Sequence, residues 1–321
     1  MNNNLPKFLL LGVMLFTTVF FSQQSLGDFS AGGGSASGGK TLVDLGREPL
    51  SASVAVVTDE VFTKEVAPTE PDFVRVGEKG APAVEAKGAL VTDIKTGKVY
   101  YGLNPEIRWP LASITKLVSA VVAKDFLDED QEVTMMQGDF DLETNYYVLK
   151  SGGKYRVEDL IWAMLLSSSN EAAVAVARTH GYDEFIEAMN VKTERWGLKD
   201  TNFDDPSGLS VSNQSTLFDL KRIIEAIYEA YPEIFEMTTE SGWTIYDSAN
   251  DTFSRVETTN DFVGRDDFLG GKTGYTDEAM GNLVSLFSYQ ERPILVIVLG
   301  TSDRFGDTRL LYGWFTENFR I

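Results

Sequence analysis

The chain has 321 residues, of which 43% are hydrophobic, which is enough for a folded core and gives a prior of about two domains. It contains no cysteine and one histidine, His180, which excludes disulfides, thiolate nucleophiles and metal sites with two histidines. A Ser–His–Asp triad would have to use His180. The net charge of −20 disfavours nucleic acid as a partner, because phosphates would repel the chain.

The N-terminus has the pattern of an export segment. Lys7 precedes an uncharged apolar run over residues 8–21, which is shorter than a relaxed membrane span. Residues 25–27 offer small side chains for a cleavage site after Gly27. We therefore expect residues 1–27 to be a signal peptide or an uncleaved membrane anchor. Either places the rest of the chain outside the cytoplasm, anchored to the membrane or secreted to the cell wall or periplasm.

Residues 28–81 have the composition of a linker. A glycine- and serine-rich stretch covers residues 32–39, and prolines interrupt the short β-prone runs that follow. The sequence predicts a flexible tether or a loosely docked arm here. The main folded domain is expected over residues 82–321.

Strand patterns occur at both ends of this domain, and helix patterns fill its middle. Residues 89–93 and 99–103 predict one hairpin, and residues 283–289 and 294–299 predict another. Apolar residues recur at helical spacing in six further segments: 113–126, 157–165, 171–178, 183–196, 216–231 and 307–319. We expect an α/β (α+β) fold. One antiparallel sheet is built from both chain ends and packed with helices, beside a mostly helical subdomain.

The first candidate site motif is the tetrapeptide from Ser113 to Lys116. On a helix, residues three apart share a face, so the Lys116 amine can reach the Ser113 hydroxyl. A serine nucleophile needs a neighbour that takes its proton, and with one histidine in the chain a lysine of lowered pKa is the available alternative. Alone, the tetrapeptide is more typical of a capped helix start with a solvated lysine.

Two further motifs follow along the chain. Ser168-Ser169-Asn170 ends an apolar helix, where the hydroxyl and the amide can face one cleft, although helix capping also explains them. Lys272-Thr273-Gly274 follows two glycines and suits a ligand with a carboxylate, although a glycine-rich turn also explains it. Together the three match the set S-x-x-K, S-D-N and K-T-G of class A β-lactamases and penicillin-binding proteins, with Ser169 replacing the aspartate.

Longer stretches carry a more specific resemblance. The chain resembles the D-alanyl-D-alanine carboxypeptidase family of low-molecular-mass penicillin-binding proteins over about residues 85–320. The stretches that carry it are PLASITK (110–116), YRVEDLIWAMLLSSSNEAA (155–173), NFDDPSGL (202–209), STLFDL (215–220) and GGKTGYTD (270–277). The resemblance implies a β-lactamase/penicillin-binding fold and a serine hydrolase that trims peptidoglycan stem peptides ending in D-Ala-D-Ala. It also implies acylation by β-lactam antibiotics, with no metal and no cofactor.

The resemblance implies catalytic roles for four residues. Ser113 would attack the carbonyl between the two D-Ala residues, and Lys116 would take its proton. Ser168 would relay a proton to the leaving amine. The backbone N–H groups of Ser113 and Tyr275 would form the oxyanion hole, where negative charge develops.

Substrate-binding roles are implied for the remaining motif residues. Asn170 would hold the peptide and help to fix Lys116. Lys272 and Thr273 would bind the terminal carboxylate, and Gly274 would let the ligand approach the backbone.

Several alternatives remain open from sequence. Endopeptidase or transpeptidase action on cross-linked stems would use the same residues. A class A β-lactamase needs a glutamate that activates water, and Glu194 is the nearest candidate but lacks the expected spacing. A non-catalytic wall-binding protein would be expected to lack the nucleophile or the base. His180 is interpreted as a structural residue at a helix end, and the acidic pair Asp204-Asp205 has no mechanistic account.

Overall fold

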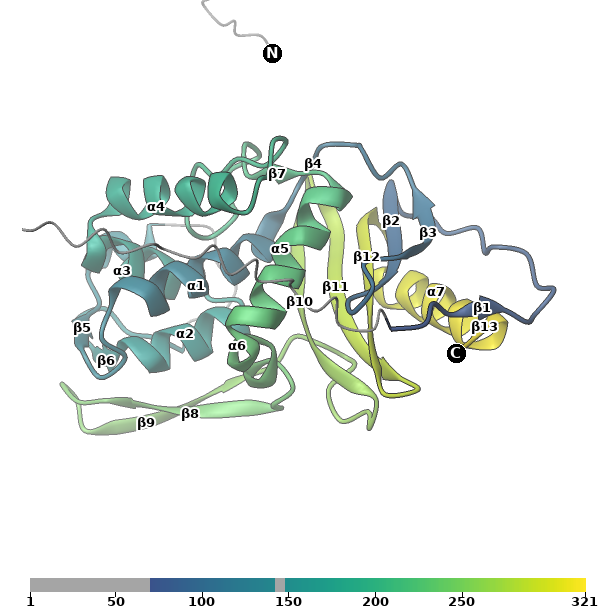
Figure 1. The fold of residues 1–321 in the computed structure, drawn as a ribbon. Helices are drawn as coiled ribbons and strands as arrows, with labels where there is room; N and C mark the ends of the chain where they lie inside the picture. The colour runs from purple at the N-terminus through teal and green to yellow at the C-terminus, as the bar shows by residue number, and fades with distance from the viewer. Residues whose placement is uncertain (1–69, 142–147) are drawn as a thin grey trace, which may run out of the picture. The chain divides into compact units, whose positions relative to one another are not determined.

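The computed structural model describes residues 70–141 and 148–321, shown as the coloured ribbon in Figure 1. The expected export segment, most of the expected linker and residues 142–147 lie outside the described residues. No helix within the described ranges is both long enough and apolar enough to cross a membrane.

The central element is a five-stranded antiparallel sheet in the order β10-β11-β12-β2-β3. Its strands are β2 (Gly88–Asp93), β3 (Val99–Leu103), β10 (Phe268–Thr276), β11 (Met280–Tyr289) and β12 (Arg292–Thr301). The β12 strand pairs with β2, with Val296 opposite Val91, and this pairing joins the two ends of the domain. The predicted antiparallel sheet is therefore confirmed.

Both faces of this sheet are apolar because helices cover both. Along β12, Leu295 and Ile297 belong to the core shared with the helical subdomain. The alternate residues Val296 and Val298 belong to the core under α7 (Arg304–Asn318). Successive side chains of a strand point to opposite faces, so a strand buried on both sides is a continuous apolar run.

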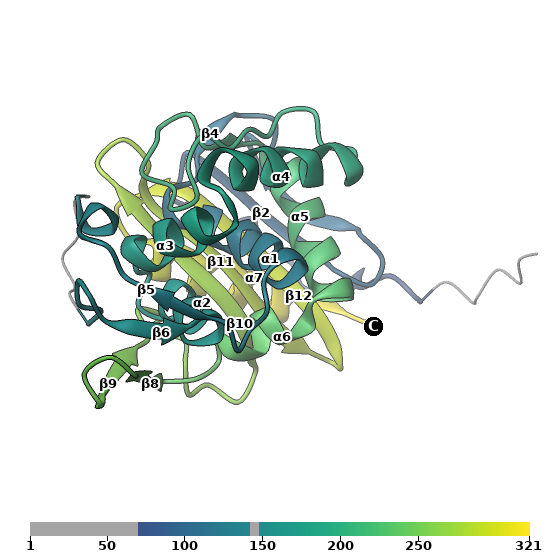
Figure 2. The same ribbon diagram turned by 90° about the vertical axis from the view of Figure 1, so that its left-hand side faces the viewer.

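The helical subdomain surrounds one central helix. Its members are α1 (Lys116–Phe126), α2 (Val157–Leu165), α3 (Asn170–His180), α4 (Tyr182–Arg195), α5 (Leu217–Ala230) and α6 (Pro232–Met237). Figure 2 shows α1 among the other helices, in front of the sheet. Every residue from Lys116 to Ala123 is buried, as expected for a helix with neighbours all round. The predicted helix over 113–126 begins as a 3-10 turn, η1 (Ala112–Thr115), before α1.

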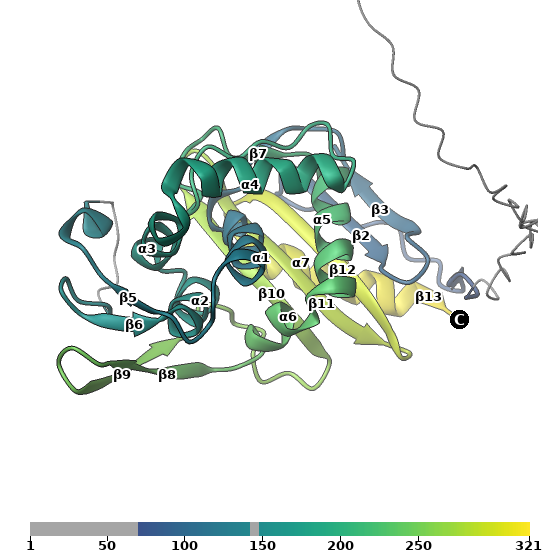
Figure 3. The same ribbon diagram turned by 60° about the vertical axis from the view of Figure 1, so that its left-hand side comes forward.

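Short strands complete the fold. They form the pairs β1 (Val74–Arg75) with β13 (Phe319–Arg320), β4 (Trp109–Pro110) with β7 (Gln214–Ser215), β5 (Glu132–Thr134) with β6 (Lys154–Arg156), and β8 (Gly242–Asp247) with β9 (Thr252–Glu257). A second 3-10 turn is η2 (Gln137–Phe140). Figure 3 shows the β8–β9 hairpin beside β5 and β6. Neither this hairpin nor α6 was predicted.

Residues 70–79, which we call the N-terminal arm, dock on the domain. The β1 strand of the arm pairs with β13 at the chain's end. Phe73 is 1% exposed and contacts the rings of Tyr100, Tyr289 and Phe315. The folded part thus begins before residue 82 and includes part of the predicted linker over 28–81.

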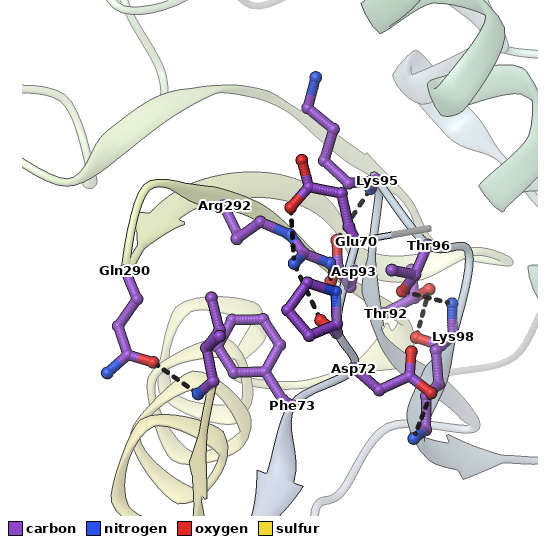
Figure 4. A network of polar contacts seen from close by, with 12 residues as sticks. Glu70, Asp72, Phe73, Thr92, Asp93, Lys95, Thr96, Lys98, Gln290 and Arg292 are labelled. Atoms are coloured by element: carbon purple, nitrogen blue, oxygen red, sulfur yellow. Dashed lines mark hydrogen bonds and ion pairs between the residues drawn. The ribbon is translucent and has the colours of Figure 1, made fainter. Parts of the chain in front are cut away.

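A polar network fastens the same arm (Figure 4). Arg292 forms a buried ion pair with Asp93, and its Nη1 also donates to the Pro71 carbonyl over 3.0 Å. Asp72 accepts from Lys98 over 2.9 Å. A buried guanidinium needs several acceptors, and the arm supplies two of them, the Pro71 carbonyl and the Glu70 carboxylate at 3.3 Å.

Candidate active site

Ser113 lies in the 3-10 turn η1, and Lys116 is the first residue of α1. The Lys116 Nζ is 2.9 Å from the Ser113 Oγ, as the spacing predicts. The preceding residue, Ala112, has a φ of 48°, which is a strained conformation for a residue with a side chain. A Cβ on Gly208 would lie 1.9 Å from the Ala112 carbonyl oxygen, so only glycine allows this close approach.

The Lys116 amine has three polar neighbours. Besides Ser113, its Nζ contacts the Oδ1 of Asn170 at 2.7 Å and the backbone carbonyl of Ser207 at 2.6 Å. Both oxygens are acceptors only. A neutral amine has two N–H groups for these acceptors, so its lone pair is left for the Ser113 hydroxyl. The arrangement can therefore take the serine's proton.

The electrostatics of Lys116 favour this neutral form. Its side chain is fully buried, and burial lowers the pKa of Lys116 to about 7. The negative charges of Asp205 and Glu171 act in the opposite direction and keep the pKa from falling further. A base whose pKa lies near neutrality is suited to proton transfer at physiological pH.

Lys272 on β10 and Ser168 between α2 and α3 form a second pair. The Lys272 Nζ donates to the Ser168 Oγ over 3.0 Å and to the Thr273 carbonyl over 3.1 Å. Ser168 has a φ of 62°, a second strained residue at the site. Burial lowers the pKa of Lys272 well below its usual value, and the positive charges of Lys116 and Arg304 lower it further.

Gly274 of the third motif packs against the turn that holds Ser113 of the first motif. A Cβ on Gly274 would lie 2.9 Å from the Leu111 carbonyl oxygen and 3.3 Å from the Ile114 nitrogen. Hence β10 packs directly on the turn that holds Ser113. The next residue, Tyr275, is exposed. The structure therefore brings members of all three motifs into one site between β10 and the helical subdomain, whereas Ser169 caps α3 by accepting from the Ala172 N–H.

Four residues at this site carry no signal in the three motifs. The Thr259 Oγ1 is 2.7 Å from the Thr273 Oγ1, and Arg304 donates to the Gly274 carbonyl over 3.1 Å. The Ser207 carbonyl contacts the Lys116 Nζ, and the Asp205 carboxylate accepts from the Ser207 N–H. Backbone contacts depend on tertiary packing, so residue identity alone does not reveal them.

His180 and Glu194, which the sequence offered as alternative catalytic residues, lie outside this site. His180 ends α3 and packs against Phe126, at the opposite end of α1 from Lys116. A Ser–His–Asp triad with Ser113 is therefore not built. Glu194 is exposed in the last turn of α4. Over residues 70–141 and 148–321, no group of three or more acidic or histidine side chains could hold a metal ion.

Comparison with known proteins shows which family the chain is similar to. Residues 75–303 match the family described as D-alanyl-D-alanine carboxypeptidase. The D-alanyl-D-alanine endopeptidase of Escherichia coli is 32% identical over 244 residues, which cover 73% of this chain and 78% of the relative.

Solved structures agree with this match. A D-alanyl-D-alanine carboxypeptidase from Mycobacterium tuberculosis has a TM-score of 0.68 at 28% identity, covering 76% of this chain and 95% of that one. Penicillin-binding protein D2 from Listeria monocytogenes, in a cefotaxime-bound form, has a TM-score of 0.66 at 27% identity, covering 73% and 98%. Since the family match spans more than half of its length, this chain belongs to the D-alanyl-D-alanine carboxypeptidase family of serine peptidases.

Proposed function

We propose that Ser113 is the nucleophile of this peptidase and that Lys116 is its general base. The observation that carries the proposal is the setting of the Lys116 amine, which is buried and placed between two acceptors and the Ser113 hydroxyl. A serine hydroxyl becomes a nucleophile when an adjacent base takes its proton. The pKa of Lys116, lowered to about 7, supports this role.

The proposed reaction proceeds through an acyl-enzyme. The Ser113 Oγ forms a bond to the carbonyl carbon of the D-Ala-D-Ala peptide, and its proton passes to Lys116. The C–N bond then breaks, and the leaving amine receives a proton through Ser168. The N–H groups of Ser113 and Tyr275 would stabilise the oxyanion, where one donor is worth about 3–4 kcal/mol. In the second half, a water molecule would form a bond to the acyl carbon and give a proton to Lys116, and the ester bond would break with return of that proton to the Ser113 Oγ.

The residues around Lys272 would bind the C-terminal end of the substrate. A terminal carboxylate next to Lys272 stabilises the charged form of that lysine, whose pKa is lowered in the free site. The Thr273 hydroxyl and Gly274 would complete the carboxylate subsite, and Asn170 would hold the peptide. The hydrogen-bond donors of this subsite are charged or pre-oriented, so they favour binding of a carboxylate over binding of an amide.

The proposed substrate is a peptidoglycan stem peptide ending in D-Ala-D-Ala, so the enzyme would act outside the cytoplasm. Residues 1–27 would direct export or anchor the chain, and residues 28–69 would tether it. The Listeria relative carries bound cefotaxime. We infer that β-lactams likewise acylate Ser113 here.

A second candidate is endopeptidase action on cross-linked stems. The Escherichia coli relative at 32% identity is a D-alanyl-D-alanine endopeptidase, which favours this alternative. Both reactions share the acyl-enzyme and differ in the amine that leaves. A carboxypeptidase releases free D-alanine, and an endopeptidase releases a second stem peptide.

Two substrates separate these activities. Full-length protein and the Ser113→Ala variant would be incubated with diacetyl-Lys-D-Ala-D-Ala and, separately, with a cross-linked stem-peptide dimer. Release of D-alanine by the wild type alone supports a carboxypeptidase. Cleavage of the dimer alone, with penicillin labelling of Ser113, supports an endopeptidase. A folded wild type that cleaves neither and is not labelled by penicillin contradicts the proposed roles.

A further inference from the structure

Asp205 belongs to the acidic pair Asp204-Asp205, which lies outside the three motifs. Its carboxylate accepts four hydrogen bonds within one turn. The Oδ1 accepts from the Ser207 N–H at 2.6 Å, the Ser207 hydroxyl at 2.6 Å and the Gly208 N–H at 2.7 Å. The Oδ2 accepts from the Ser210 N–H at 2.7 Å. The carboxylate therefore fixes the backbone of residues 205–210, which we call the acidic turn.

Residues outside the acidic turn also hold it against α1. The Ser119 hydroxyl donates to the Pro206 carbonyl over 2.6 Å. Asn213 donates to the Asp205 carbonyl over 2.8 Å and to the Thr115 hydroxyl over 3.2 Å. These contacts come from different elements, so the turn has little freedom to shift relative to α1.

One carbonyl of this turn contacts the proposed base. The Ser207 oxygen accepts from the Lys116 Nζ over 2.6 Å, and Gly208 approaches the Ala112 carbonyl beside Ser113. If the Ser207 carbonyl moved, one N–H of the amine would lose its partner. The amine could then rotate, and its lone pair would no longer be held toward Ser113. A displacement of about 1 Å at such a group can cost about a hundredfold in rate.

We propose that Asp205 is a positioning residue for Lys116, because it holds the Ser207 carbonyl on the amine and so directs the amine toward Ser113. The inference rests on the proposed role of Lys116 as the base. All the donors to Asp205 are N–H or O–H groups, so a carboxylate suits the turn and an amide does not. An asparagine would present its own N–H groups to one of those donors.

Asp205 also contributes charge at the site. The charged groups acting on or near Lys116 are Asp205 on the acidic turn, Glu171 on α3 and Lys272 on β10. Asp205 raises the pKa of Lys116, so removal of its charge favours the neutral amine at lower pH. A purely structural role in the turn would change stability and leave the plateau rate of acylation per folded molecule unchanged.

The neighbouring Asp204 is a matched control. It carries the same charge immediately before the acidic turn, but it is exposed and its Oδ2 accepts from the Ser210 hydroxyl at 2.9 Å. It is not among the groups that shift the pKa of Lys116. Asp204→Asn thus changes the net charge equally without the contacts that the proposal invokes.

The test compares full-length wild type, Asp205→Asn and Asp204→Asn. The rate constant of acylation by a fluorescent penicillin would be measured from pH 5 to 9, with thermal unfolding in parallel. For Asp205→Asn we expect the plateau rate to fall about tenfold or more. We also expect the acidic limb of the profile to move to lower pH. For Asp204→Asn we expect a rate within about twofold of wild type and an unmoved limb.

An Asp205→Asn variant with an unchanged plateau rate overturns the proposal, whatever its stability and wherever its acidic limb lies. If that variant does not fold, Asp205→Glu keeps the charge and lengthens the side chain. It should keep the limb in place and lower the plateau rate, and an unchanged plateau rate overturns the proposal. Failure of the proposed function gives a different result, because penicillin would then not label the wild type, or would still label Ser113→Ala.

Discussion

The positive charge of Lys116 lowers the pKa of Lys272, although the two lysines belong to different elements, α1 and β10. Both side chains are buried in one site, so the second proton is harder to add than the first. A substrate carboxylate would relieve this repulsion by supplying a negative charge. The free site is therefore poised for an anionic ligand and for a neutral base.

The first prediction concerns the pH dependence of acylation. Only the neutral form of Lys116 accepts a proton, and its pKa is about 7. Below that pH, the rate of penicillin acylation should fall about tenfold per unit. Stopped-flow measurement with a fluorescent penicillin checks this, and Lys116→Ala should be acylated at no pH while remaining folded. A rate that stays constant from pH 5 to 8 would contradict the assignment of the base.

The second prediction concerns the carboxylate subsite. Lys272→Ala should lower kcat/KM for diacetyl-Lys-D-Ala-D-Ala by about tenfold to a hundredfold, since a charged hydrogen bond contributes about 1.5–3 kcal/mol. The same peptide with an amidated C-terminus lacks the charge and should lose much less. Steady-state kinetics on both peptides provides the comparison. An equal loss of kcat/KM on the two peptides would mean that Lys272 does not bind the carboxylate.

The third prediction concerns stability. Lys116 has a pKa of about 7 in the folded chain and an ordinary value of 10.5. Between these values the unfolded state binds more protons, so this lysine makes wild-type stability rise with pH. Lys116→Met lacks this dependence. The unfolding free energy of the variant minus that of wild type should therefore decrease by on the order of 3 kcal/mol from pH 7 to 10.

Urea unfolding of the two proteins at several pH values measures this difference. Lys150→Met removes an exposed lysine and serves as the matched control for the loss of one positive charge. A difference between Lys116→Met and wild type that is constant with pH would mean that Lys116 is charged in the folded site. The buried base therefore lowers stability near neutral pH, a cost that enzymes often bear at their active sites.

The sheet was predictable because its pattern is local. The run over 294–299 is apolar at every position, since it is buried on both faces. The helical spacing of Ser113 and Lys116 is also local, and the structure keeps it. By contrast, β8 and β9 lack a regular alternation of apolar and polar residues, with exposed Phe253 among polar neighbours. A hairpin with one weakly apolar face gives little periodic signal.

The contacts that sequence could not predict are those made by tertiary packing. Ser207 contributes a backbone carbonyl to Lys116, and any residue type has such a carbonyl. Arg304 reaches Gly274 from the start of α7, after two intervening strands. Motif reading finds side-chain chemistry at fixed spacing, whereas these contacts depend on how distant segments pack.

The fourth prediction concerns the N-terminal arm. Phe73 is buried among aromatic rings on the α7 side of the sheet, whereas Ser113 lies on the other side. Phe73→Ala should lower the unfolding free energy by about 3–5 kcal/mol, as for other buried phenylalanines. The exposed neighbour Val74 offers a control, and Val74→Ala should change it by less than about 0.5 kcal/mol.

Urea unfolding measures both variants, and penicillin acylation per folded molecule should equal that of wild type in each. The arm fills an aromatic cluster and supplies an acceptor to the buried Arg292, so its loss should expose both. Equal stability of Phe73→Ala and Val74→Ala would mean that the arm adds nothing to the domain and acts only as a tether. A large loss in Phe73→Ala alone makes residues 70–79 an integral part of the catalytic unit, since an independent linker would not stabilise it.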